Sequence, residues 1–208
     1  MREIVTSMFV SLDGVAQAPG GPEEDTSGGF KFGGWTFPYF DEAGGKVMEE
    51  IFQHKFDLLL GRKTYDIFAG YWPRVTEKHP DHAIGSLFNA ATKYVATHRP
   101  KTLKWENTEW LGQNPVAALR KLKKGNGPTL LTQGSTDFLQ TLLAADLIDR
   151  LTLLTFPVTL GKGKKLFGNG TRPGGFKLVK SMTSPSGVMV GFYERAGAVK
   201  TGSFGPAV

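Results

Sequence analysis

Short apolar runs alternate with segments of helical periodicity along most of the chain. Runs with strand character cover residues 4–10, 58–60, 93–97, 129–132 and 151–158. Leu58, Leu59 and Leu60 form an unbroken apolar run, which is typical of a strand covered on both faces. Strands of this kind that alternate with helices predict an α/β protein with a mostly parallel sheet.

The segments between these runs carry signals for the start and end of helices. Asp41 is a candidate N-cap, and apolar residues then recur at helical spacing as far as Lys55. Asn114 and Pro115 are expected to start another helix, which Gly125 should end in a left-handed conformation. Two further helices are expected, one directly after the run at 58–60 and one with the apolar face Phe138, Leu139, Leu142 and Leu143.

The last part of the chain has two strands without an intervening helix. Residues 176–181 and 188–195 should form a hairpin around Pro185, Ser186 and Gly187. An antiparallel hairpin would then close one edge of the sheet. We expect a single domain over residues 1–195, followed by a flexible tail at 196–208.

A long loop, at about residues 17–40, is expected between the first strand and the first helix. Glycines in its first half should make that half mobile, while its second half is rich in aromatic residues. We predict that the aromatic half forms a lid, with Trp35 and Tyr39 near a substrate and Asp41 at the edge of the pocket. A disordered insertion is the alternative for the loop as a whole, and burial in a dimer interface is the alternative for its aromatic rings.

Composition narrows the possible chemistry. The chain has 208 residues and no cysteine, which excludes disulfides, thiolate metal sites and thiol nucleophiles. His79 and His82 lack an evident third ligand, so no metal is expected. A formal net charge of +6 favours anionic ligands, but the chain has no basic stripe or recognition motif, and we expect no nucleic-acid partner.

The first residues of the chain and its apolar segments indicate where in the cell the protein is expected. No cleavable leader is evident after Met1, so a cytoplasmic location is expected. The most apolar tract, at residues 142–160, is interrupted by Asp146, Asp149 and Arg150. Charges in these positions argue against a membrane-spanning segment.

Two glycine turns are the best candidates for a phosphate site. Gly61 and Gly134 each follow a predicted buried strand and precede a helix, where free amides attract phosphate oxygens. Close packing of strand and helix is the alternative reason for either glycine. The residues beside them suit an anion: Arg62, Lys63 and Thr64 after the first turn, and Gln133 and Ser135 around the second.

Other polar residues have weaker support. Thr97, His98 and Arg99 could contact an adenosine ribose or its 2′-phosphate, or form a surface turn. The lysines of segment 161–165 are expected to form a solvated connection rather than an anion loop. Asp13 and Asp41 are the candidates for acid–base catalysis, although each could instead be a turn former or helix cap.

These motifs, taken in order, resemble the dihydrofolate-reductase-like superfamily, and most closely its branch with the reductase domain of riboflavin-biosynthesis deaminase–reductases. The resemblance covers residues 2–195 and rests on the segments Ser11-Leu12-Asp13-Gly14, Leu60-Gly61-Arg62-Lys63-Thr64-Tyr65, Gly134-Ser135 with Phe138-Leu139, and Leu147 through Phe167. It implies a three-layer α/β fold that binds NADPH at the carboxyl ends of the strands.

The resemblance also assigns roles to individual residues. Arg62, Thr64, Gly134 and Ser135 would meet the cofactor phosphates. The other residues that we expect at the cofactor are Val15, Ala16, Gly61, Lys63, Thr97, His98, Arg99, Gln133 and Phe138.

The implied activity is hydride transfer from NADPH to a C=N or C=O carbon of a pterin, pyrimidine or related small-molecule substrate, by a homodimer. A catalytically silent nucleotide-binding module is the alternative. The chain departs from the family by lacking a second glycine at position 133, by having no deaminase half, and by its longer loop at 17–40.

Overall fold

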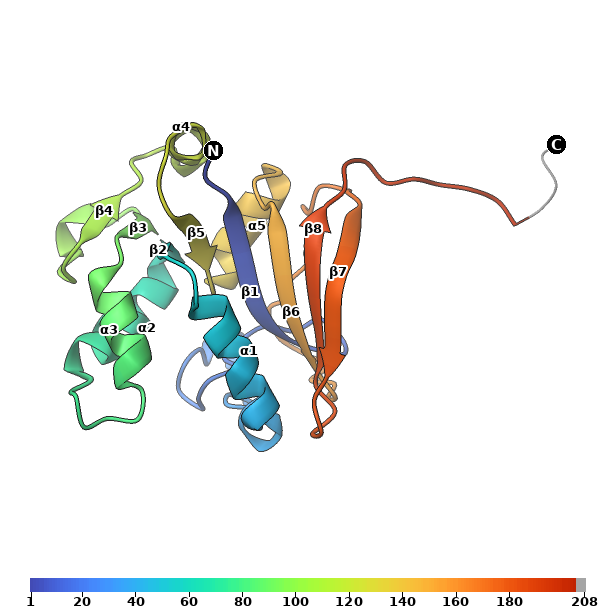
Figure 1. The fold of residues 1–208 in the computed structure, drawn as a ribbon, viewed down its shortest axis with the longest axis horizontal. Helices are drawn as coiled ribbons and strands as arrows, with labels where there is room; N and C mark the ends of the chain where they lie inside the picture. The colour runs from blue at the N-terminus through green and yellow to red at the C-terminus, as the bar shows by residue number, and fades with distance from the viewer. Residues whose placement is uncertain (205–208) are drawn as a thin grey trace.

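The computed structural model describes residues 1–204, and it contains an eight-stranded sheet in the order β4-β3-β2-β5-β1-β6-β8-β7 (Figure 1). The strands are β1 (Ile4–Ser11), β2 (Phe56–Gly61), β3 (Lys93–Ala96), β4 (Thr108–Trp110), β5 (Thr129–Thr132), β6 (Arg150–Phe156), β7 (Phe176–Thr183) and β8 (Met189–Arg195). Strands β1 to β6 pair in parallel, whereas β8 pairs antiparallel with both β6 and β7. The predicted parallel sheet with an antiparallel edge hairpin is confirmed.

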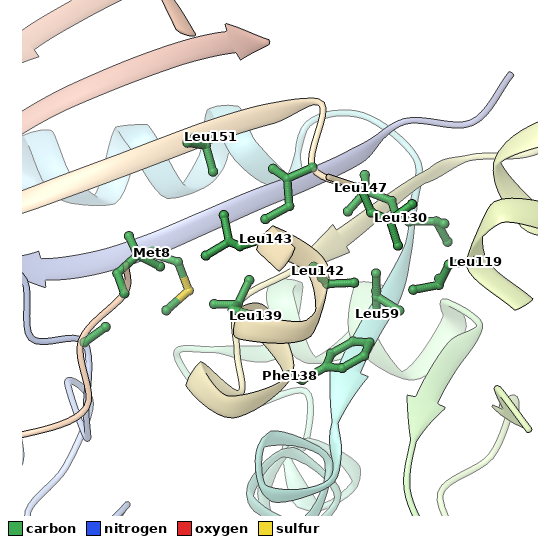
Figure 2. Packing of buried hydrophobic residues seen from close by; sticks show 14 of the residues in the cluster. Met8, Leu59, Leu119, Leu130, Phe138, Leu139, Leu142, Leu143, Leu147 and Leu151 are labelled. Carbon is green, nitrogen blue, oxygen red and sulfur yellow. The ribbon is translucent and has the colours of Figure 1, made fainter. Parts of the chain in front are cut away.

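Helices cover both faces of this sheet and produce three layers. They are α1 (Glu42–Phe52), α2 (Arg62–Tyr71), α3 (His82–Ala90), α4 (Pro115–Lys124) and α5 (Thr136–Ala144). Leu59 packs with the apolar residues of α4 and α5, as Figure 2 shows for α5. Leu58 and Leu60 point to the opposite face, where they pack with α2 and α3. The unbroken apolar run of β2 is therefore buried on both sides, as predicted.

Several local predictions need correction. Residues 82–90 form α3, a helix that the sequence analysis did not predict. Ile84, Leu87 and Phe88 have the i, i+3, i+4 spacing of a helix and could have revealed it. The three-residue strand β4 was also missed. Gly125 ends α4 in an extended conformation, with φ −81° and ψ 179°, and the positive φ occurs two residues later, at Gly127.

The chain leaves the sheet after β8. Ala196 and Gly197 still pair with Gly175 through backbone hydrogen bonds, and residues 199–204 extend away from the domain (Figure 1). The flexibility of the tail at 196–208 stays a prediction, and its residues 205–208 lie outside the described part of the chain. Within residues 1–204, no helix is long and apolar enough to span a membrane.

Candidate active site

Two glycine turns meet at the carboxyl ends of β2 and β5, which are neighbours in the sheet. A Cβ added to Gly61 would lie 2.1 Å from Ser135 Oγ, and one added to Gly134 would lie 2.6 Å from Thr64 Oγ1. The turns are therefore interlocked, and each glycine makes room for a hydroxyl side chain of the other turn. The Gly134–Ser135 peptide bond is cis.

The same edge of the sheet carries the first turns of α2 and α5. Gly61 and Ser135 are the N-caps of these helices, and neither helix has a side-chain hydrogen bond at its N-cap. Backbone N–H groups at the start of a helix, together with the helix dipole, favour an anion. Two such helix starts in contact can hold two linked phosphates better than either can alone.

A basic cavity of about 870 Å³ lies on one side of the turns. It contains these predicted cofactor residues: Gly61, Arg62, Lys63, Thr97, His98, Arg99, Ser135 and Phe138. The Arg62 guanidinium is held by Asp66, with Nε 2.8 Å from Oδ1, and by the carbonyl of Arg99 at 3.1 Å. Arg62 thus ties the first turn to the segment that follows β3.

An aromatic cavity of about 660 Å³ lies on the other side and shares Lys63 and Ser135 with the basic cavity. Its apolar wall includes the aromatic residues Phe9, Phe40, Phe52, Phe68, Tyr71, Trp72 and Phe88. Ala16, Thr64, Gln133 and Gly134 also line it, so the structure brings most of the predicted cofactor residues to two adjoining cavities.

Asp25 connects the glycine-rich half of the loop to this site. Its carboxylate accepts hydrogen bonds from Lys63 Nζ at 2.7 Å and from the Ser27 hydroxyl at 2.5 Å, and it pairs with Lys164 Nζ at 3.1 Å. Burial alone would raise the pKa of Asp25, but these donors outweigh it and hold the pKa well below its usual range. The carboxylate is therefore ionised at neutral pH and offsets much of the charge of Lys63 and Lys164 in the aromatic cavity.

Glu24, the neighbour of Asp25, is a half-buried carboxyl on the wall of the aromatic cavity. Its Oε2 accepts a hydrogen bond of 2.6 Å from the backbone N–H of Gly20. Burial raises the pKa of Glu24, and the nearby charge of Asp25 acts in the same direction. The protonated form is therefore favoured here more than at an exposed glutamate.

The two carboxylates predicted as catalytic have structural roles outside both cavities. Asp13 accepts hydrogen bonds from the Ser11 hydroxyl and from the amides of Leu160 and Gly161. Asp41 caps α1 through the Gly44 amide and also accepts from the amide of Ser186. These hydrogen bonds lower the pKa of each carboxyl to about 2. Carboxylates that are held ionised by donors on other segments act as turn and helix anchors.

Of the aromatic half of the loop, Thr36 and Phe40 line the aromatic cavity, but Trp35 and Tyr39, which were predicted near a substrate, line neither cavity. Trp35 is buried against Phe156, and its indole N–H donates to the carbonyl of Gln17 at 2.8 Å. Tyr39 packs edge-to-face on the same phenylalanine. Val15, predicted at the cofactor, is fully buried in that cluster. These side chains belong to an apolar core cluster that also contains residues of β6 and β8.

The glycine-rich half of the loop forms the cavity wall instead. Pro19, Gly20, Gly21, Glu24 and Asp25 line the aromatic cavity. Sequence analysis missed these residues because glycine was interpreted as mobility. Lys164 was also missed, because segment 161–165 was interpreted as a solvated connection. Its ammonium group forms ion pairs with Asp25 and Asp137. The acidic pair at 24–25 and the three lysines within 162–165 carry opposite charges, and this complementarity was the available signal.

No group of three or more metal-ligating side chains occurs among residues 1–204. His79 instead accepts a hydrogen bond from the Asp81 amide at 3.1 Å, and His82 is the first residue of α3. The polar residues of the site are therefore those of the two glycine turns, the loop carboxylates and the lysines between them.

The sheet order, the edge hairpin and the paired glycine turns define a protein of the dihydrofolate-reductase-like fold. Residues 2–190 match the family described as the RibD C-terminal domain, and the chain belongs to that family. It is also 24% identical over 188 residues to the uncharacterized protein YyaP of Bacillus subtilis (strain 168), over 90% of this chain and 92% of that one.

Two solved structures illustrate the fold. One is a diaminohydroxyphosphoribosylaminopyrimidine deaminase/5-amino-6-(5-phosphoribosylamino)uracil reductase from Thermotoga maritima, with a TM-score of 0.59 and 17% identity over 94% of this chain and 57% of that chain. The other is dihydrofolate reductase from Enterococcus faecalis complexed with NADP(H) and RAB-propyl, with a TM-score of 0.55 and 16% identity over 93% of this chain and 96% of that chain. At these identities the likeness establishes the fold.

Proposed function

We propose that this protein is an NADPH-dependent reductase that transfers a hydride to a C=N or C=O carbon of a small heterocyclic substrate. The observation that carries the proposal is the contact between two glycine turns, each at the start of a helix. Each turn also contributes a residue, Lys63 or Ser135, that lines both the aromatic and the basic cavity. Membership of the RibD C-terminal domain family supports a reductase-type function.

The residues present fit a dinucleotide. Gly61 and Gly134 let the two turns approach each other closely, and Thr64 and Ser135 place hydroxyls beside the helix starts. Arg62, Thr97, His98 and Arg99 line the basic cavity and suit an adenosine phosphate. When bound, NADPH would supply the hydride. The complex of the Enterococcus faecalis reductase with NADP(H) is consistent with this cofactor.

The aromatic cavity suits a flat ring system. Phe9, Phe40, Phe52, Phe68 and Phe88 provide apolar surface on several sides, so a heterocycle could stack and exclude water from the reacting atoms. The pyrimidine named for the Thermotoga maritima enzyme and the folate named for dihydrofolate reductase are both substrates of this shape class. A pterin or pyrimidine is therefore the substrate type that we propose.

The positions of Asp13 and Asp41 favour a second candidate, a nucleotide-binding module without turnover. Both carboxylates are occupied by structural hydrogen bonds, so neither is available to the cavities. A fold that retains its cofactor site can lose its chemistry.

Cofactor binding and turnover test these candidates separately. NADPH should bind with micromolar affinity, measured by the change in its fluorescence or by calorimetry, and absence of binding at millimolar NADPH would contradict both candidates. NADPH oxidation is then followed by absorbance with dihydrofolate, a ribosylaminopyrimidine and simple carbonyl compounds. Oxidation with a heterocycle supports the reductase, whereas binding without oxidation across the panel supports the silent module.

A further inference from the structure

Hydride addition to a C=N or C=O bond leaves a negative charge on the nitrogen or oxygen, and a proton must neutralise it. Resting on the proposed reductase function, we propose that Glu24 is the catalytic acid that donates this proton. Its carboxyl lies on the wall of the aromatic cavity, on the loop that follows β1.

The position of Glu24 is fixed by its own loop. The carboxylate oxygen Oε2 accepts from the Gly20 amide at 2.6 Å, and the backbone N–H of Glu24 donates to the carbonyl of Gly21 at 3.2 Å. A Cβ at Gly20 would already lie 3.2 Å from Oε2, which shows how closely the carboxyl approaches this turn. One oxygen is thus anchored at the wall of the aromatic cavity, and in the proposed step the other carries the proton.

Two other acidic residues, Asp25 and Asp81, line the aromatic cavity, and they are less suitable as proton donors. Asp25 is ion-paired with Lys63 and Lys164, so it stays ionised and has no proton to donate. Asp81 accepts a 2.5 Å hydrogen bond from the Tyr71 hydroxyl. That hydrogen bond raises the pKa of Tyr71 to about 12, which makes the phenol a weak acid at neutral pH.

The groups around Glu24 adjust its acidity in opposite directions. Burial and the negative charge of Asp25 raise the pKa of Glu24, whereas the Gly20 amide and the charge of Lys63 lower it. Three other ionisable residues line the same cavity as Glu24: Lys164, which is paired with Asp25, and Tyr71 and Asp81. The net effect is a raised pKa, which favours the protonated form of Glu24 more than at an exposed glutamate.

The proposed step balances in electrons and protons. A hydride from NADPH forms a C–H bond at the substrate carbon, the π pair of the C=N or C=O bond moves to the heteroatom, and Glu24 gives that heteroatom its proton. The cofactor is oxidised and the substrate reduced by two electrons. Glu24 is left as a carboxylate and recovers a proton from solvent, because the cavity is open to water.

The test compares Glu24→Gln, Glu24→Asp and the control Glu23→Gln with the parent protein. A glutamine at position 24 keeps an oxygen for the Gly20 amide but cannot donate an acidic proton. Glu23 is exposed and lies outside both cavities, so the control makes the same chemical change one residue away. NADPH affinity, kcat and its pH profile are measured with the best heterocycle of the panel.

For the parent protein we expect kcat to fall as pH rises through the Glu24 pKa, since the protonated form is active. Glu24→Gln should lower kcat by about 10²-fold or more and abolish this pH dependence. The NADPH affinity of Glu24→Gln should stay within about twofold of that of the parent protein. Glu24→Asp should recover part of the lost kcat, and Glu23→Gln should have the kcat and pH profile of the parent protein.

Other outcomes would overturn the proposal. If the parent protein reduces a substrate and Glu24→Gln keeps both the rate and the pH profile, Glu24 is not the acid, while the reductase function stands. If Glu24→Gln loses NADPH binding and turnover together, Glu24 acts in binding or folding instead. If the parent protein oxidises NADPH with no member of the panel, the reductase function and the role of Glu24 fail together.

Discussion

Replacement of Gly61 by alanine tests whether the two glycine turns must interlock. Gly61 has a φ of −75°, which any residue adopts, so the substitution brings no backbone strain. The new Cβ would instead lie 2.1 Å from Ser135 Oγ and 2.8 Å from Phe138 Cβ. Ser135 can change rotamer, but the Cβ of Phe138 is fixed to the backbone of α5, so β2 and α5 must separate. Overpacking of this kind costs about 1–3 kcal/mol.

The same displacement would move Ser135 and the first turn of α5 away from the phosphate site. We therefore expect Gly61→Ala to lower both the free energy of unfolding, measured with urea, and the affinity for NADPH, measured by fluorescence. The control is Gly70→Ala, near the end of the same helix, where an added Cβ meets nothing within 4 Å. Alanine is favoured over glycine in a helix by up to about 1 kcal/mol, so the control should be neutral or stabilising.

A Gly61→Ala protein with the stability and NADPH affinity of the parent would refute the interlocked-turn argument. Loss of stability with unchanged affinity would show that the glycine serves packing alone. That result would favour the alternative reason for the turn, close approach of strand and helix, and would remove the main support for a phosphate site.

Two further predictions concern charged residues of the site. Arg62→Ala should weaken NADPH binding by about 1.5–3 kcal/mol, since a charge-assisted hydrogen bond to the cofactor would be lost, whereas Arg120→Ala on the exposed side of α4 should not. Equal affinities in calorimetry would exclude Arg62 from the site. Asp25→Asn should destabilise the fold by about 1–3 kcal/mol, because hydrogen bonds to two lysines are weakened. The Asp25 pKa is lowered in the folded state, so its stabilisation is present above the unfolded value of about 4 and is lost as pH falls below it. Urea unfolding at pH 7 and pH 3 should therefore show a smaller pH effect in Asp25→Asn, and an unchanged difference would contradict the ion-pair assignment.

The sheet could be predicted from sequence because its strands are marked by local patterns. The run at 58–60 is apolar on both faces, and Asn114 with Pro115 marks the start of α4. The end of α4 was less predictable, since Gly125 is extended and the positive φ falls at Gly127. Both positions are glycines, and the choice between them depends on the path of the chain toward β5, which tertiary packing sets.

The pair of glycine turns was also predictable, because these turns directly follow strands. Gly61 and Gly134 are far apart in sequence, but parallel strands bring their carboxyl ends to one edge of the sheet. The loop was not predictable in the same way. Its aromatic residues could cover either a cavity or the core, and the structure shows that Trp35 and Tyr39 pack on the buried Phe156 at the end of β6.

The acidic residues show why the carboxyl groups that line the aromatic cavity could not be predicted from sequence. Asp13 and Asp41 stand next to turns and helix starts, where a short side chain reaches nearby amides, and this is the pattern of a structural carboxylate as much as of a catalytic one. No turn or helix-start pattern in the sequence singles out Glu24. Its carboxyl is anchored by the Gly20 amide, and the loop that carries both residues is tied by Asp25, one residue later, to lysines of α2 and of the segment after β6. The acid we propose is thus positioned by ion pairs between distant segments, so its identity depends on the fold and on the charge of its neighbour.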